Sequence, residues 1–146
     1  MSGGIHHARR AALALLVCVL LGSQTVTAQD PRAAAVQRVA REWLTLVDKL
    51  DAAASWSAAG ARFQQGMTPA QWAGILQSDR APRGAIVQRA VATTTFSSSG
   101  PGLPAGGEYA LVRFRSSFAN LADGGEEVVL EVGPGYAWRV IGYMLI

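Results

Sequence analysis

The segment of residues 107–133, GEYALVRFRSSFANLADGGEEVVLEVG, decides the fold of this chain because apolar and polar residues alternate along it. The apolar positions of the two runs are Val112, Phe114, Phe118, Val128, Leu130 and Val132. A period of two residues is typical of a strand with one buried face. Residues 122–125, ADGG, predict a tight hairpin turn. We therefore expect antiparallel strands near residues 107–119 and 125–133.

Two further strands are predicted beside this pair, near residues 85–97 and 136–145. In the last strand, Trp138, Val140 and Met144 would extend the buried face. Its remaining apolar residues, Ile141, Tyr143 and Leu145, would then lie on the outer face. The strand at 85–97 has apolar residues at both parities, so its orientation stays open.

Charged residues occupy the outer face of this predicted sheet. They are Arg113, Arg115, Glu127, Glu131 and Arg139. Opposite charges on neighbouring strands are expected to pair in water, and such pairs are weak. An alternative is that the three arginines bind an anionic partner such as a polysaccharide or a phospholipid head group.

The preceding part of the chain reads as helices. Apolar residues recur at helical spacing over residues 31–50, with Asp30 and Pro31 as start signals. Asp51 is expected to cap a second helix that ends near Gly60, and Thr68 to Gln71 form a capping box for a third. The prediction is an α+β domain, with three N-terminal helices packed on one face of a curved four-stranded antiparallel sheet.

Residues 1–28 have the order of a secretory signal peptide: basic residues, an uncharged run over 11–21, then a polar stretch that ends at Ala28. The run is shorter than the roughly 20 residues that span a bilayer. We expect cleavage between Ala28 and Gln29, which leaves residues 29–146 as a single exported domain, periplasmic or secreted.

Loss of this segment removes Cys18, His6 and His7, the only cysteine and histidines of the chain. The remainder can form no disulfide, thiolate nucleophile, Ser-His-Asp triad or His- or Cys-ligated zinc site. It keeps 11 of the 13 basic residues against 10 acidic ones, a net charge of +1. Nucleic-acid binding is therefore not expected, and neither a cofactor nor a metal is predicted.

The order of short motifs resembles a bacterial family called domain of unknown function 4019. The motifs are Trp43 with Asp48, Ser55-Trp56, Trp72, the turn Arg80 to Gly84, Gly107-Glu108-Tyr109, and Trp138 to Tyr143. The resemblance covers about residues 33–145. It implies a short exported protein with a fold similar to the cystatin-like or nuclear transport factor 2-like superfold. It implies no activity, because that superfold carries many functions.

The favoured interpretation is a non-catalytic module that binds a small apolar ligand or an envelope protein. Its weak pocket candidates are Trp43, Trp72, Phe114 and Trp138, aromatic residues on faces expected to meet inside the sheet. The competing interpretation of these residues is that they simply fill the core.

Two other functions stay open. One is an isomerase- or dehydratase-like enzyme that uses an aspartate and a tyrosine in the same concavity. Its carboxylates would be Asp48, Asp51 or Asp79, although each also fits a role as helix cap or surface residue. The other is a structural homodimer formed through the outer apolar residues of the last strand.

Overall fold

The computed structural model describes residues 30–146, so the predicted signal peptide and its cleavage site lie outside the described residues. The order of elements is helices first and strands second, as expected for an α+β domain. Four α-helices precede the sheet: α1 (Ala33–Asp48), α2 (Ala52–Ala58), α3 (Ala61–Gly66) and α4 (Pro69–Ile75). A π-helical turn (Leu76–Arg80) and a 3-10 turn (Ala81–Arg83) follow α4.

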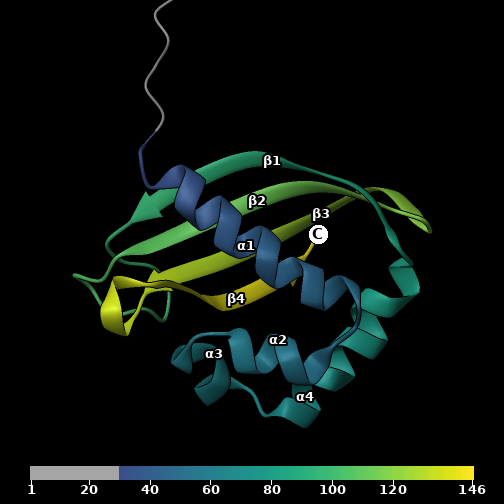
Figure 1. The fold of residues 1–146 in the computed structure, drawn as a ribbon, viewed down its shortest axis with the longest axis horizontal. Coiled ribbons are helices and arrows are strands. Elements are labelled where there is room, and N and C mark those ends of the chain that lie inside the picture. The colour runs from purple at the N-terminus through teal and green to yellow at the C-terminus, as the bar shows by residue number, and fades with distance from the viewer. Residues whose placement is uncertain (1–29) are drawn as a thin grey trace, which may run out of the picture.

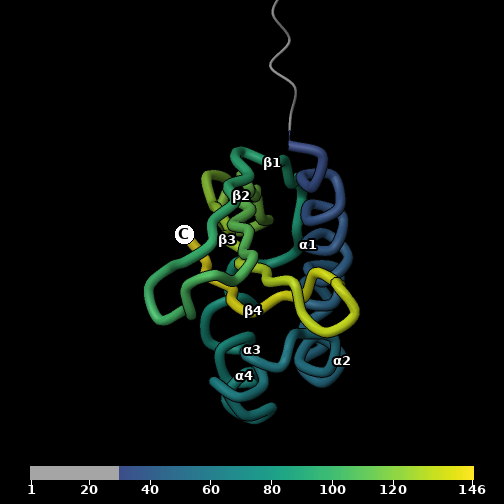
Figure 2. The backbone as a smooth tube through the Cα atoms, turned by 90° about the vertical axis from the view of Figure 1, so that its left-hand side faces the viewer, coloured from purple at the N-terminus to yellow at the C-terminus, as the bar shows by residue number. Residues whose placement is uncertain are grey.

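The sheet is an antiparallel meander in the order β1-β2-β3-β4. Its strands are β1 (Ile86–Ser97), β2 (Tyr109–Phe118), β3 (Leu121–Val132) and β4 (Trp138–Leu145). Helix α1 lies diagonally across one face, while α2, α3 and α4 lie beside the free edge of β4 (Figure 1). The view turned by 90° shows the sheet and α1 as two layers (Figure 2).

The helical half corrects the prediction of three helices on one face. Residues 30–146 form four α-helices because Gly60, extended at φ −72° and ψ 162°, ends the second helical stretch and becomes the N-cap of α3. Of these four, only α1 crosses the sheet (Figure 1). The predicted caps at Asp51 and Thr68 are confirmed: Asp51 accepts from the Ala54 N–H at 3.0 Å, and Thr68 and Gln71 form a capping box. The start predicted at Pro31 is wrong, because α1 begins at Ala33 and its N-cap, Arg32, makes no side-chain cap bond.

The turn predicted at residues 122–125 is wrong. The chain reverses at Ala119 and Asn120, and β3 begins at Leu121. The two glycines serve close packing within the strand instead: a Cβ atom at Gly124 would lie 2.8 Å from the carbonyl oxygen of Ser116. An ordinary side chain there would push β3 away from β2.

The inner face of β2 and β3 is buried as predicted, and Val112, Phe114, Val128 and Leu130 are at most 2% exposed. The last strand departs from simple alternation. Its register jumps between Val129↔Gly142 and Leu130↔Val140, so Ile141 is an extra residue. This β-bulge reverses the parity beyond it. Tyr143 therefore packs against the core and Met144 is 57% exposed, the reverse of the expectation.

The sequence pattern does not orient strand β1 because this strand also contains bulges. Its pairing with β2 is irregular between Ile86 and Gln88 and again between Val91 and Thr93. Two extra residues shift the inward positions, which become Ile86, Arg89, Val91, Thr94 and Phe96 by their pairing with the inward residues of β2. A strict period of two residues cannot describe a strand with two bulges.

Candidate functional site: an apolar groove between α1 and β4

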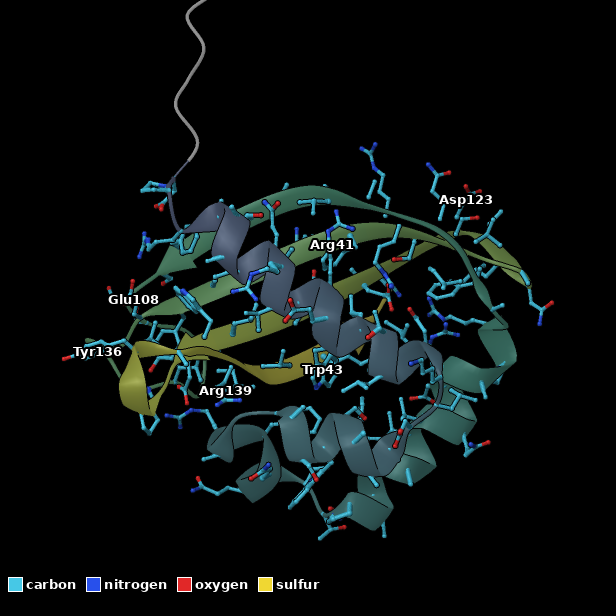
Figure 3. The ribbon with its side chains drawn as sticks, in the orientation of Figure 1. Arg41, Trp43, Glu108, Asp123, Tyr136 and Arg139 are labelled. Carbon is cyan, nitrogen blue, oxygen red and sulfur yellow. The ribbon has the colours of Figure 1, made fainter. Side chains whose placement is uncertain are left out.

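An open groove of about 310 Å³ runs between α1 and the beginning of β4. Val39, Trp43 and Leu46 line it from the helix, and Trp138 and Val140 line it from the strand. Ala58, at the end of α2, closes one side. Figure 3 shows Trp43 on the side of α1 that faces β4, and Arg139 on the strand itself. The walls are therefore mostly apolar.

The floor of the groove is Trp43, which belongs to a closely packed aromatic cluster. The ring of Trp43 stacks on Trp72 with centroids 5.7 Å apart, and meets Phe63 and Tyr143 edge-on at 5.9 and 5.5 Å. Such offset and edge-on contacts stabilise by about 0.5–1.5 kcal/mol beyond the area they bury. A ligand in the groove would meet a preformed surface.

Ser55 holds two of these rings in place. It is fully buried, and its hydroxyl accepts a hydrogen bond from the Trp72 indole N–H at 2.8 Å. Its backbone carbonyl accepts from the Trp43 indole N–H at 2.9 Å. Both polar groups of the buried rings are thus satisfied by one residue of α2.

Trp138 differs from the other tryptophans. Trp43, Trp56 and Trp72 each donate their indole N–H to a protein acceptor. Within residues 30–146, Trp138 has no such acceptor, and its ring is half-buried beside Phe96 with centroids 6.0 Å apart. A large ring with a free donor at an open groove is suited to contact a partner.

The predicted pocket candidates therefore fall into two pairs. Trp43 and Trp138 line the groove, Trp138 as a half-buried wall and Trp43, 3% exposed, as part of the core beneath it. Trp72 and Phe114 are 1% and 2% exposed and lie in the core behind it. The sheet interior itself is filled, because α1 packs onto the concave space in which a pocket was expected.

A second cluster surrounds Asp48, the last residue of α1, where four ionisable side chains meet. The guanidinium of Arg89 donates to both carboxylate oxygens of Asp48, each at 2.8 Å, and to Glu126 at 2.7 and 3.1 Å. Arg80 adds a bond to Asp48 at 3.1 Å. Two negative and two positive charges compensate each other here.

Burial makes this charge cluster unlike the surface pairs. Glu126 is fully buried, Arg80 is 1% exposed, and Glu126 also accepts from the hydroxyls of Ser116 and Tyr143. Burial lowers the pKa of Arg89. Its hydrogen bonds to Asp48 and Glu126 together raise that pKa by more than burial lowers it, so the net shift is upward. Burial, reinforced by the charge of Glu126, raises the pKa of Tyr143 well above its ordinary range. Arg89 stays charged and Tyr143 stays a donor.

Residues 39–143 match the family described as "Protein of unknown function (DUF4019)". The chain belongs to this DUF4019 family. The match spans both the groove and the charge cluster. No curated protein matches the sequence.

The carboxylates considered for catalysis are all engaged in the DUF4019 chain. The expectation that Asp48 is a solvated surface residue is wrong, because its side chain is 15% exposed and bound by two arginines. Asp51 caps α2, and Asp79 accepts from the hydroxyl of Ser78 at 2.8 Å. None of the three lines the groove.

The tyrosines considered as their partners are equally dispersed. Tyr109 donates to the Pro104 carbonyl at 2.8 Å, and Tyr136 is 92% exposed. Tyr143 donates to Glu126 rather than to an aspartate. The aspartate–tyrosine pair that the enzyme hypothesis requires is not assembled within residues 30–146.

The outer face of the DUF4019 sheet carries ion pairs. Arg113 bonds Glu127 at 2.6 Å, which confirms the expected cross-strand pairing for these two residues. Glu131 lies opposite Arg139 in the register but is bound by Arg62 of α3 at 3.1 Å instead. Tyr143 turns inward, so the outer apolar strip predicted for β4 is reduced. Met144, which was predicted to face inward, is exposed on this strand instead.

Sequence reasoning missed Glu126 and Arg89. Glu126 shares the parity of Val128 and Leu130, which placed it on the inner face of β3 from the outset. Arg89 lies between two bulges, and no pattern in the sequence assigns it to the inner face.

Among the described residues, no three His, Cys, Asp or Glu side chains are grouped to hold a metal ion. Over residues 30–146, every helix is too short or too polar to cross a bilayer.

Proposed function

We propose that this DUF4019 chain is an exported, non-catalytic binding module that receives an apolar group in the groove between α1 and β4. The observation that carries the proposal is the half-buried Trp138, with its free indole N–H, beside a groove floored by Trp43. Apolar pockets with few polar groups are the usual sites for ligands and anchoring side chains.

The charge cluster supports the non-catalytic part of this proposal. Its carboxylates are neutralised by arginines inside the protein, so neither is free to take a proton from a substrate. General base catalysis needs a carboxylate within hydrogen-bonding reach of a bound substrate. The open groove and the ionised cluster are separate regions.

A dye-binding titration tests the groove. Anilinonaphthalene sulfonate, a fluorescent dye with apolar aromatic rings and one sulfonate group, should bind the purified protein and fluoresce more strongly. The Trp138→Ala variant should lose at least ten-fold in affinity, because one of the two aromatic side chains that line the groove is removed. Met144→Ala is the matched control: the residue lies on the same strand but faces away from the groove. Equal affinity of both variants would contradict the proposal.

Export is proposed from the signal-like residues 1–28. Expression of the full chain in a bacterial host, followed by cell fractionation, should place the protein outside the cytoplasm. Its N-terminal residue should be Gln29. A cytoplasmic protein that retains Met1 would contradict this part of the proposal alone.

We also propose that the fold is similar to the cystatin-like or nuclear transport factor 2-like superfold. A helix lying across a four-stranded antiparallel meander supports it. Superposition of an experimental structure on members of that superfold tests it. A different path of the helices around the sheet would contradict it.

A further inference from the structure

The backbone of Trp138 has hydrogen-bonding groups that point out of the sheet. The Ala137 carbonyl accepts from the Gly133 N–H at 2.9 Å, toward β3, whereas the Val140 carbonyl accepts from the Gly60 N–H at 2.7 Å, away from β3. Backbone groups alternate along an antiparallel strand. The N–H and C=O of Trp138 therefore point to the same side as the Val140 carbonyl.

This side is the free edge of β4, and the groove lies beside it. Within residues 30–146, neither backbone group of Trp138 has a hydrogen-bond partner. Trp138 is followed along the edge by Val140, where Gly60 already pairs in an extended conformation. An open donor and acceptor at a strand edge form a template for another extended chain.

Gly60 shows how closely a backbone approaches this edge. A Cβ atom there would lie 3.0 Å from the Cβ of Arg139 and 3.3 Å from the Val140 carbonyl oxygen. The edge is thus closed at Val140 and open at Trp138. An incoming segment must run from Trp138 toward the Pro134–Tyr136 turn (η3) rather than across α3.

We propose that the groove receives an extended peptide segment of a partner protein, which pairs with both backbone groups of Trp138 and inserts one large apolar side chain beside Trp43. This inference rests on the proposed function and names its ligand class. The residue that pairs with Trp138 projects its side chain to the same face as the Trp138 ring. A volume of about 310 Å³ fits one such side chain.

A charged side chain at the rim of the groove indicates which residue type the peptide carries next to its apolar anchor. Arg139 lines the groove, and within the described residues it forms no ion pair. Glu42, on the opposite rim, is already paired with Arg38 at 3.1 Å. The peptide therefore carries an acidic group next to its apolar anchor, where it meets Arg139.

Selection from random heptapeptides displayed on phage, with the purified protein as bait, tests the inference. Binders should share a large apolar residue adjacent to Asp or Glu. Selection against the Arg139→Gln variant should retain the apolar residue and lose the acidic preference. A library that yields no enrichment over Trp138→Ala would overturn the inference.

The backbone contact is tested with one selected peptide and its analogue, N-methylated at the apolar residue. The unmodified peptide should protect the Trp138 amide from hydrogen exchange, and N-methylation should weaken binding at least ten-fold. Equal affinity of the two peptides, or an unprotected Trp138 amide, would refute strand pairing.

The dye titration separates this result from the proposed function. Dye binding that depends on Trp138, without peptide binding, would leave the groove a small-ligand site and remove the peptide inference. Failure of both probes would remove the groove itself as a binding site.

Discussion

Two sides of helix α1 differ in what they pack against: one carries Asp48 and the other carries the groove residues Val39 and Leu46. Around Asp48, the helix buries charges that belong in water and compensates each one with a partner. Beside β4, Val39 and Leu46 of the same helix stay only half-buried and line an apolar groove. Buried charges that all have partners stabilise one arrangement of the chain. An apolar surface that no part of the protein covers is available to a ligand. Substitutions on the two sides of α1 should therefore separate effects on stability from effects on binding.

The largest effect is expected at the charge cluster. Glu126→Gln removes the charge that Arg89 faces, and should lower the free energy of unfolding by about 3–5 kcal/mol, because a buried guanidinium loses one of its two carboxylates. Urea unfolding followed by circular dichroism measures the loss.

Glu127→Gln is the matched control, because Glu127 is the next residue but pairs with the half-exposed Arg113 on the outer face. We expect a loss of about 0–1 kcal/mol there. Similar losses in the two variants would contradict the distinction between buried and surface pairs.

The second effect concerns the floor of the groove. Ser55→Ala leaves the buried indole N–H of Trp72 without its acceptor and should cost about 1–3 kcal/mol. Ser57→Ala, on the exposed side of the same helix, should be nearly neutral. Thermal unfolding of both variants distinguishes a specific hydrogen bond from a general effect of serine removal. A neutral Ser55→Ala would show that Trp72 finds another acceptor.

A third, smaller effect is expected at the groove wall. Trp138→Ala should cost about 1–2 kcal/mol, less than the 3–5 kcal/mol typical of a core aromatic residue, because the ring is only half-buried. Denaturant unfolding measures the loss, with Trp72→Ala as the core reference. A loss as large as that of Trp72→Ala would place Trp138 in the core and weaken the case for an open groove.

The smallest effect on stability is expected at the start of the domain, where Asp30 and Arg32 form an exposed ion pair. Hydrogen bonds from the Arg32 side chain and backbone lower the pKa of Asp30 from 3.8 to about 2. Because the pKa is lower in the folded state, the stabilisation is complete above pH 3.8 and disappears as the pH falls through about 2.

Carbon-detected NMR titration of the Asp30 carboxyl should give this low midpoint. Arg32→Gln should return the midpoint toward 3.8. An unchanged midpoint in the variant would assign the shift to another cause.

Local patterns predicted much of the fold. The α+β order, the capping box at Thr68 and the inner faces of β2 and β3 follow from neighbouring residues. The number of helices and the position of the β2–β3 turn did not, because Gly60 and Gly124 also suit the roles that the patterns favoured. Glycine permits a turn, a cap and a close strand contact alike.

In the candidate site, too, some features follow from the sequence and others only from the tertiary structure. The sequence by itself determined which aromatic residues are available and excluded chemistry that needs histidine or cysteine over residues 29–146. Only the tertiary structure decided that Trp138 borders an opening while Trp72 does not, and that Asp48, Arg80, Arg89 and Glu126 meet. Those outcomes depend on bulges and on contacts between residues as distant in the chain as Trp43 and Tyr143. Periodicity describes one element at a time, whereas burial and charge compensation arise between elements.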